Sequence, residues 1–90
     1  MPIDDDQIRA CILEALSARD AQASACPSEI ARRLAADEAG WRALMPAVRR
    51  VALELAAGGR LRITQGERIL EGEDLPRGPI RLRRGPAFEG

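Results

Sequence analysis

Arginine supplies all 14 basic side chains of this 90-residue chain. Four of them alternate with aliphatic residues over residues 60–64 and 79–83, and a period of two is typical of β-strands. If the two strands pair, one face carries Arg60, Arg62, Arg81 and Arg83, and the other carries Leu61, Ile63, Ile80 and Leu82. Facing like charges cost roughly 0.2–1 kcal/mol per pair, so an anion is expected to compensate them. The phosphates of duplex DNA are one candidate. The chain's own acids are the other, namely Glu67, Glu71, Glu73 and Asp74.

Further arginines are predicted on or near a helix over residues 46–57. Arg49 and Arg50 fall on or beside its outward face, and Arg42 precedes it. A guanidinium fork matches both a guanine edge and a phosphate, so these side chains are candidates for contact with DNA. The alternative is that Arg49 pairs with an acid such as Glu38 and that Arg50 is simply solvated.

Two neighbouring residues on the same helix argue against contact between this helix and DNA. Leu53 is predicted to be exposed, which suits a protein contact, and Glu54 would repel phosphate. Gln65 could bond a base edge or cap its own turn, and the turn is the favoured interpretation. Arg77 and Arg84 are expected to extend whichever cationic patch forms.

The side chains that most enzymes need are missing from the sequence. It contains no histidine and no tyrosine, and Cys11 and Cys26 do not form a Cys-x-x-Cys pair. We therefore predict no catalytic residue, no metal site, no cofactor and no enzymatic activity. Cys26 stands at a predicted helix start, where the pKa of a thiol can fall, but a half-buried structural cysteine is favoured. Trp41 is expected to fill the junction between the second and third helices rather than to stack on a base.

The first two helices have clear start signals. Asp4 and Gln7 fit a capping box, and the apolar stripe that follows ends near Ser17. The second helix starts at Cys26–Pro27, because proline is favoured at the first helical position. Residues 35–40 are then expected to form the turn.

The third helical region is predicted in two parts. One turn covers residues 41–44, and Pro46 then starts a longer helix that ends at Gly58 and Gly59. Two short extra strands are also expected, around residues 23–25 and 68–71. The pattern predicts an α+β fold, namely a winged helix-turn-helix with a three-helix core and a C-terminal β-hairpin wing.

Length and charge fit one small domain over residues 1–90, with a core at about 4–84 and a loose tail at 85–90. Residues 1–40 carry eight acids and four arginines, whereas residues 41–90 carry ten arginines and six acids. A basic half beside an acidic half is compatible with one face that meets phosphate. No apolar run reaches 18 residues, so we expect a cytoplasmic protein with no membrane partner.

Several motifs together resemble a known family. They are Cys26-Pro27-Ser28-Glu29-Ile30-Ala31, then Trp41-Arg42-x-Leu44-Met45-Pro46-x-Val48-Arg49, then Thr64-Gln65-Gly66, and finally Gly78-Pro79-Ile80-Arg81-Leu82. In this order they are similar to a small bacterial family known as domain of unknown function 3253, over about residues 5 to 85. The resemblance implies a winged-helix fold and no established activity. A DNA-binding role for the family is an inference from the fold by analogy, since one fold hosts many functions.

The sequence thus favours a DNA-binding winged-helix protein, a transcription-associated regulator that contacts duplex DNA through helix 46–57 and the arginine-rich wing. The alternative is a protein–protein interaction module of the same fold that does not bind DNA. The oligomeric state stays open, and recognition of a specific operator would require a homodimer, because one helix and one wing cover a short site. The candidate DNA-binding residues are Arg42, Arg49, Arg50, Arg60, Arg62, Gln65, Arg81 and Arg83.

Overall fold

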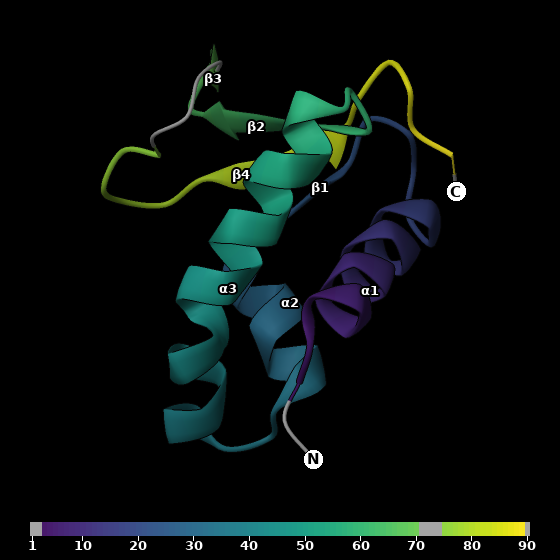
Figure 1. Cartoon of the computed structure of the whole chain (residues 1–90). Helices are drawn as coiled ribbons and strands as arrows, with labels where there is room; N and C mark the ends of the chain where they lie inside the picture. Colours follow the sequence, from purple (N-terminus) through teal and green to yellow (C-terminus); the bar gives the residue numbers. More distant parts are fainter. Residues whose placement is uncertain (1–2, 71–74, 90) are drawn as a thin grey trace.

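The computed structural model describes residues 3–70 and 75–89. Three helices lie on one side of a small antiparallel sheet, and the longest helix runs from the sheet to the opposite end of the molecule (Figure 1). In chain order the elements are α1 (Asp5–Ser17), β1 (Ser24–Ala25), α2 (Pro27–Leu34), α3 (Glu38–Ala57), β2 (Leu61–Gln65), β3 (Arg68–Leu70) and β4 (Arg81–Arg84).

The helix starts predicted for α1 and α2 are confirmed. The Gln7 backbone N–H donates to Asp4 Oδ1, and the Asp4 backbone N–H donates to Gln7 Oε1, both at 2.9 Å. This reciprocal pair is a capping box, which satisfies two backbone donors at the helix end. Pro27 is the first residue of α2, after Cys26 as the N-cap, and α1 ends at Ser17 as expected.

The third helix is longer than predicted. The turn after α2 covers only residues 35–37, and α3 then runs without a break from Glu38 through Pro46 to Ala57. The expected restart at Pro46 is therefore wrong. Proline inside a helix removes one backbone hydrogen bond, here the one to the Arg42 carbonyl. Both residues are exposed, so water can satisfy that carbonyl, and the apolar stripe of α3 holds both halves against the core.

Replacing Pro46 by alanine is expected to stabilise the protein by about 2 kcal/mol. Alanine restores the missing N–H and has the highest helix propensity, whereas proline in a helix interior costs about 3 kcal/mol. Thermal and urea unfolding measure the change. The exposed Ala43, one turn earlier, offers the reverse control, since Ala43→Pro places a second proline inside α3. A Pro46→Ala protein that is less stable than the parent would contradict this account.

The sheet contains four strands in the order β1-β4-β2-β3, all antiparallel. The predicted pairing of residues 60–64 with 79–83 is confirmed by β2 and β4, in which Arg62 faces Arg83 and Ile63 faces Leu82. These two strands do not form a direct hairpin. β2 turns first into β3 at Gly66, whose φ of 61° is in the left-handed region that favours glycine, and β3 occupies the outer edge beside β2.

A continuous aliphatic core joins the helices to the inner face of the sheet. The four aliphatic residues predicted for that face are all buried, namely Leu61, Ile63, Ile80 and Leu82. They pack with the apolar stripes of the helices, namely Ile8, Ile12, Ala15, Leu16, Ile30, Val48, Val51, Ala52 and Leu55. The core therefore packs against the inner face of the sheet, whereas the other face points away from the helices.

The C-terminal segment is not the loose tail expected from the sequence. The Ala87 N–H donates to Gly59 O at 2.9 Å, and Gly85 N–H donates to Arg60 O at 3.1 Å. Phe88 is half-buried against the core, with the Arg84 guanidinium carbon 4.8 Å from its ring centroid. Residues 85–89 thus continue the domain.

The α+β fold and the three-helix core are confirmed. The order of the elements is also consistent with the winged helix-turn-helix that the sequence predicts. None of the described helices has the length and apolar character needed to cross a membrane.

Candidate nucleic-acid interface

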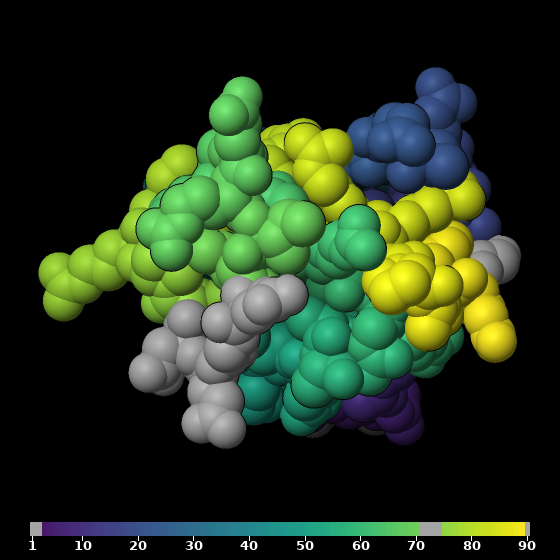
Figure 2. Space-filling view, turned by 90° about the horizontal axis from the view of Figure 1, so that it is seen from above, coloured from purple at the N-terminus to yellow at the C-terminus, as the bar shows by residue number. Residues whose placement is uncertain are grey.

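The outer face of the sheet, which points away from the helices, gathers three of the four predicted strand arginines. Arg60 precedes β2 and has no partner in the β2–β4 register, so its place on this face stays a prediction. Arg62 and Arg83 lie directly opposite each other across β2 and β4, and Arg81 lies opposite Thr64. On the other side of β2, Ile69 of β3 lies opposite Thr64 and is 53% exposed. Figure 2 views the molecule from this side, with β2 and β3 in green, β4 in yellow and the segment around β1 in blue. We call the set Arg62, Arg81 and Arg83 the cationic sheet face.

Two arginines of the cationic sheet face donate to neutral oxygens. Arg81 Nε lies 2.8 Å from Ser24 Oγ, and Arg81 Nη2 lies 3.2 Å from the Ser24 carbonyl. Arg83 Nη1 donates to the Gln22 carbonyl at 3.0 Å, and its Nε lies 3.4 Å from Thr64 Oγ1. These bonds fix the orientation of the guanidinium groups without neutralising them. Among the described residues, both side chains therefore retain an unopposed positive charge and free N–H donors.

Arg60 and Arg62 have no side-chain hydrogen bond or ion pair within residues 3–70 and 75–89. Within the same residues, no carboxylate forms an ion pair with Arg81 or Arg83 either. Of the acids proposed to compensate the arginines, Glu67 is exposed on the β2–β3 turn, and Glu71, Glu73 and Asp74 lie outside the described residues. In 60–70 and 75–84 the chain carries seven arginines and one acid. The sheet end of the molecule is therefore strongly cationic where it is described.

The arginines of α3 do not join this face. Arg50 Nη2 lies 2.6 Å from Asp5 Oδ1 of α1. Glu54 Oε2 of α3 lies 3.7 Å from Arg9 Nη2, which also belongs to α1. The two pairs link α3 to α1. The expectation that Arg50 is simply solvated is wrong, and Glu54 points toward an arginine rather than toward a prospective phosphate.

Arg42 is exposed near the start of α3, and its Nε lies 3.3 Å from Glu38 Oε2. Its guanidinium carbon is 4.9 Å from the centroid of Trp41, whose ring is also contacted by Arg32 of α2 at 4.5 Å. Trp41 is half-buried and packs against the core between α2 and α3, as expected. The stack of two cations on one indole is stabilised by cation–π attraction.

Arg49 and Gln65 hold the segment that leads into β4. Arg49 Nη2 donates to the Pro76 carbonyl at 2.9 Å, so its expected pairing with Glu38 is wrong. Gln65 Nε2 donates to the Arg77 carbonyl at 3.2 Å. The prediction that Gln65 caps its own turn is therefore wrong, because the amide braces the returning chain instead.

The remaining exposed surface of α3 is poor in hydrogen-bonding groups. Its exposed positions between Arg42 and the helix end include Ala43, Pro46 and Ala57. Leu53, expected to be exposed, is half-buried and packs against the core. Reading base edges in the major groove requires donors and acceptors on the helix surface. This face of α3 supplies few of them.

Arg84 does not extend the cationic face, contrary to expectation. It pairs with Leu61 in the β2–β4 register and so lies on the inner face of the sheet. Its guanidinium donates to the carbonyls of Leu16, Ser17 and Arg19 at the end of α1. Adjacent residues of a strand point to opposite faces of the sheet, so the sequence already placed Arg84 on the other face from Arg83. This alternation could have identified its structural role.

Several groups near β1 and α1 have shifted pKa values. The Arg19 guanidinium bonds both carboxylate oxygens of Glu29, and this contact lowers the pKa of Glu29. Burial opposes ionisation of Cys26, but hydrogen bonds from Ser28 and from the Glu29 backbone, together with the Arg81 charge, outweigh it and lower the pKa of the thiol. Burial raises the pKa of Cys11. Both cysteines are free, and the described residues contain no cluster of three acids or cysteines that could hold a metal ion.

The fold and the site define a small α+β domain with three helices and a four-stranded antiparallel sheet whose outer face is cationic. The chain belongs to the family described as "Protein of unknown function (DUF3253)", whose model matches residues 5–85. The family resemblance drawn from the sequence motifs is thereby confirmed. No curated protein matches the chain.

Proposed function

We propose that this protein is a winged-helix DNA-binding module that contacts the phosphates of duplex DNA mainly through the cationic sheet face. One observation carries the proposal. Arg62 and Arg83 face each other across β2 and β4, and no carboxylate within the described residues pairs with either of them. Facing like charges are destabilising, and phosphate oxygens compensate them with charge-assisted hydrogen bonds.

The chemistry favours contact with the backbone rather than with bases. Phosphate contacts position a protein on DNA but carry no sequence information. The described arginines of the sheet suit such contacts, whereas the exposed surface of α3 has few groups that could read a base edge. We therefore expect weak, salt-dependent binding with little sequence preference. A transcription-associated regulator that recognises a specific operator would need a homodimer or a further partner.

The proposal is tested by titrating labelled duplex DNA at low salt and following fluorescence anisotropy. The parent protein is expected to bind in the range of about 1–100 µM that is typical of non-specific contacts. Arg62→Gln combined with Arg83→Gln is expected to weaken binding and to reduce the salt slope by about two, because each phosphate contact contributes about 0.9. The matched control is Arg32→Gln with Arg33→Gln, which removes the same charge from the exposed surface of α2.

Two outcomes would overturn the proposal. One is the absence of binding up to about 100 µM, the weak end of the non-specific range. The other is an equal loss in both double variants, which would mean that total charge matters rather than the cationic sheet face. A third variant, Glu71→Gln with Glu73→Gln and Asp74→Asn, tests whether the chain's own acids compensate these arginines. If they do, this variant binds DNA more tightly than the parent.

A protein partner is the second candidate, and Ile69 is the observation that favours it. This side chain is 53% exposed on the same face as the arginines, and an exposed aliphatic group gains nothing from phosphate. An acidic partner protein that also carries an apolar side chain would contact both Ile69 and the arginines of the cationic sheet face. Ile69→Ser separates the candidates, because it is expected to leave DNA affinity unchanged and to weaken binding of such a partner.

We further propose that the protein acts in the cytoplasm and works by binding rather than by catalysis. The cationic face supplies guanidinium groups but no group that could act as a general base near neutral pH. Free thiols at Cys11 and Cys26 suit a reducing compartment.

A further inference from the structure

A groove opens between the C-terminal half of α3 and the strands β2 and β3. Its volume is about 490 Å³, which lies in the range of small-molecule sites, about 300–1,000 Å³. Leu53 and Ala56 of α3 form one wall, and Leu61 and Leu70 of the sheet form another. The groove is therefore an apolar hollow on the surface, and Leu61 and Ile63 of the buried core form part of its lining.

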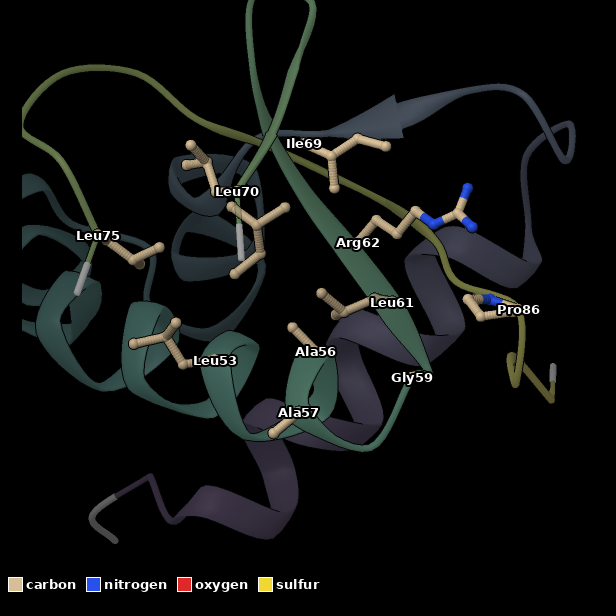
Figure 3. A pocket seen from close by; sticks show the side chains of 11 residues that line it. Leu53, Ala56, Ala57, Gly59, Leu61, Arg62, Ile69, Leu70, Leu75 and Pro86 are labelled. Carbon is tan, nitrogen blue, oxygen red and sulfur yellow. The ribbon is translucent and has the colours of Figure 1, made fainter. Parts of the chain in front are cut away.

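Among the described residues that line the groove, charge is confined to one part. Arg62 is the one charged residue in this described lining, which includes no acid. Figure 3 shows the side chains of Leu53, Leu70 and Leu75 toward one side of the view, and those of Arg62 and Pro86 toward the other. Arg62 is exposed and has no hydrogen bond or ion pair to any described residue. The lining is thus apolar along most of its length and cationic at one side.

We propose that this groove binds a small amphiphilic anion, an aliphatic carboxylate, with its chain among the leucines and its carboxylate on Arg62. Leucine and alanine side chains favour an aliphatic chain through burial of apolar area. An unpaired guanidinium favours a carboxylate, which it can bind with two parallel hydrogen bonds. A cationic amphiphile would place like charge beside Arg62, and a short carboxylate such as acetate would leave the apolar part empty.

Arg62 also belongs to the cationic sheet face, and this gives the groove a regulatory role. A carboxylate that occupies the Arg62 guanidinium neutralises the charge that faces Arg83 and blocks its donors. The ligand and DNA are then competitors for one side chain. This regulatory part rests on the proposed function, whereas the binding of the carboxylate does not.

The binding is tested with decanoate as the probe, in the absence of DNA, by following the methyl NMR signals of Leu53 and Leu70. Decanoate is expected to saturate these shifts, with decanol weaker and decyltrimethylammonium weaker still. Arg62→Gln is expected to weaken decanoate binding about tenfold, to the level of decanol, since a charged hydrogen bond contributes about 1.5–3 kcal/mol. Arg81→Gln is the matched control, because it lies on the same sheet face but does not line the groove, and it should leave the affinity unchanged.

Shifts that do not saturate, or an affinity that Arg62→Gln leaves unchanged, would overturn the ligand site. Ala56→Leu, which fills the groove and keeps the charge, is expected to weaken decanoate and decanol alike, and unchanged affinity there would also count against it. Competition is then measured by adding decanoate to the protein–DNA titration. Binding of decanoate without displacement of DNA would retain the ligand site and overturn the shared use of Arg62.

Discussion

Replacing Arg84 by methionine is expected to lower the free energy of unfolding by about 3 kcal/mol. Arg84 Nε and Nη2 lie 3.2 and 3.1 Å from the Leu16 carbonyl, and Nη2 also lies 2.9 Å from the Arg19 carbonyl. The last carbonyls of a helix have no partner within the helix, and a cation at that end also interacts favourably with the helix dipole. Hydrogen bonds to a charged group contribute about 1.5–3 kcal/mol, and this side chain makes several.

Urea unfolding of the variant measures this loss. The matched control is Arg77→Met, which removes an exposed arginine with no side-chain partner among the described residues and should change the stability by less than about 0.5 kcal/mol. Arg84→Lys keeps the charge but not the planar fork, so an intermediate loss is expected. Equal stability of the Arg84→Met and Arg77→Met proteins would show that the contact between β4 and α1 contributes nothing.

Gly85→Ala is the second variant with a large expected effect, and it should also lower the free energy of unfolding by about 3 kcal/mol. A Cβ at this position would lie 2.8 Å from the Leu61 backbone nitrogen and 2.9 Å from its carbonyl carbon, and it would collide with the Gly59 carbonyl oxygen. All three atoms belong to backbone, so no side chain can move aside. Overpacking in a well-packed region costs about 1–3 kcal/mol, and a backbone obstacle leads us to expect the upper end.

Gly58→Ala is the control for Gly85→Ala. Its φ of −85° suits alanine, and the nearest atoms to an added Cβ lie 3.7 and 3.9 Å away. Its stability is expected to stay within about 0.5 kcal/mol of the parent or to rise slightly. Thermal unfolding of both variants tests the pair. A Gly85→Ala protein as stable as Gly58→Ala would mean that residues 85–89 do not pack on β2.

Local chemistry explains the parts of the fold that could be predicted. The capping box of Asp4 and Gln7, the start of α2 at Pro27 and the alternation of β2 involve neighbours a few residues apart. Such signals act over one helical turn or one strand, so a single sequence contains them in full. The same alternation correctly predicted the shared face of Arg62, Arg81 and Arg83.

Pro46 illustrates where a local rule fails. The rule that proline ends a helix considers one hydrogen bond, whereas packing of the whole apolar stripe of α3 decides whether the helix continues. The sequence contains the stripe on both sides of Pro46 but not the core surface that holds it. The short strand predicted around residues 68–71 is found as β3, whose three residues are held in place by pairing with β2.

The sequence by itself determined the order of the helices and strands, the apolar faces that form the core, and the presence of many arginines with few candidate catalytic groups. Only the tertiary structure decided what each arginine does. Arg50 meets Asp5, Arg49 meets Pro76 and Arg84 meets the end of α1, and each contact joins residues at least 27 positions apart. A guanidinium group can donate hydrogen bonds to a carboxylate, a carbonyl or a phosphate. Its partner is therefore chosen by whichever oxygen the folded chain brings within about 3 Å.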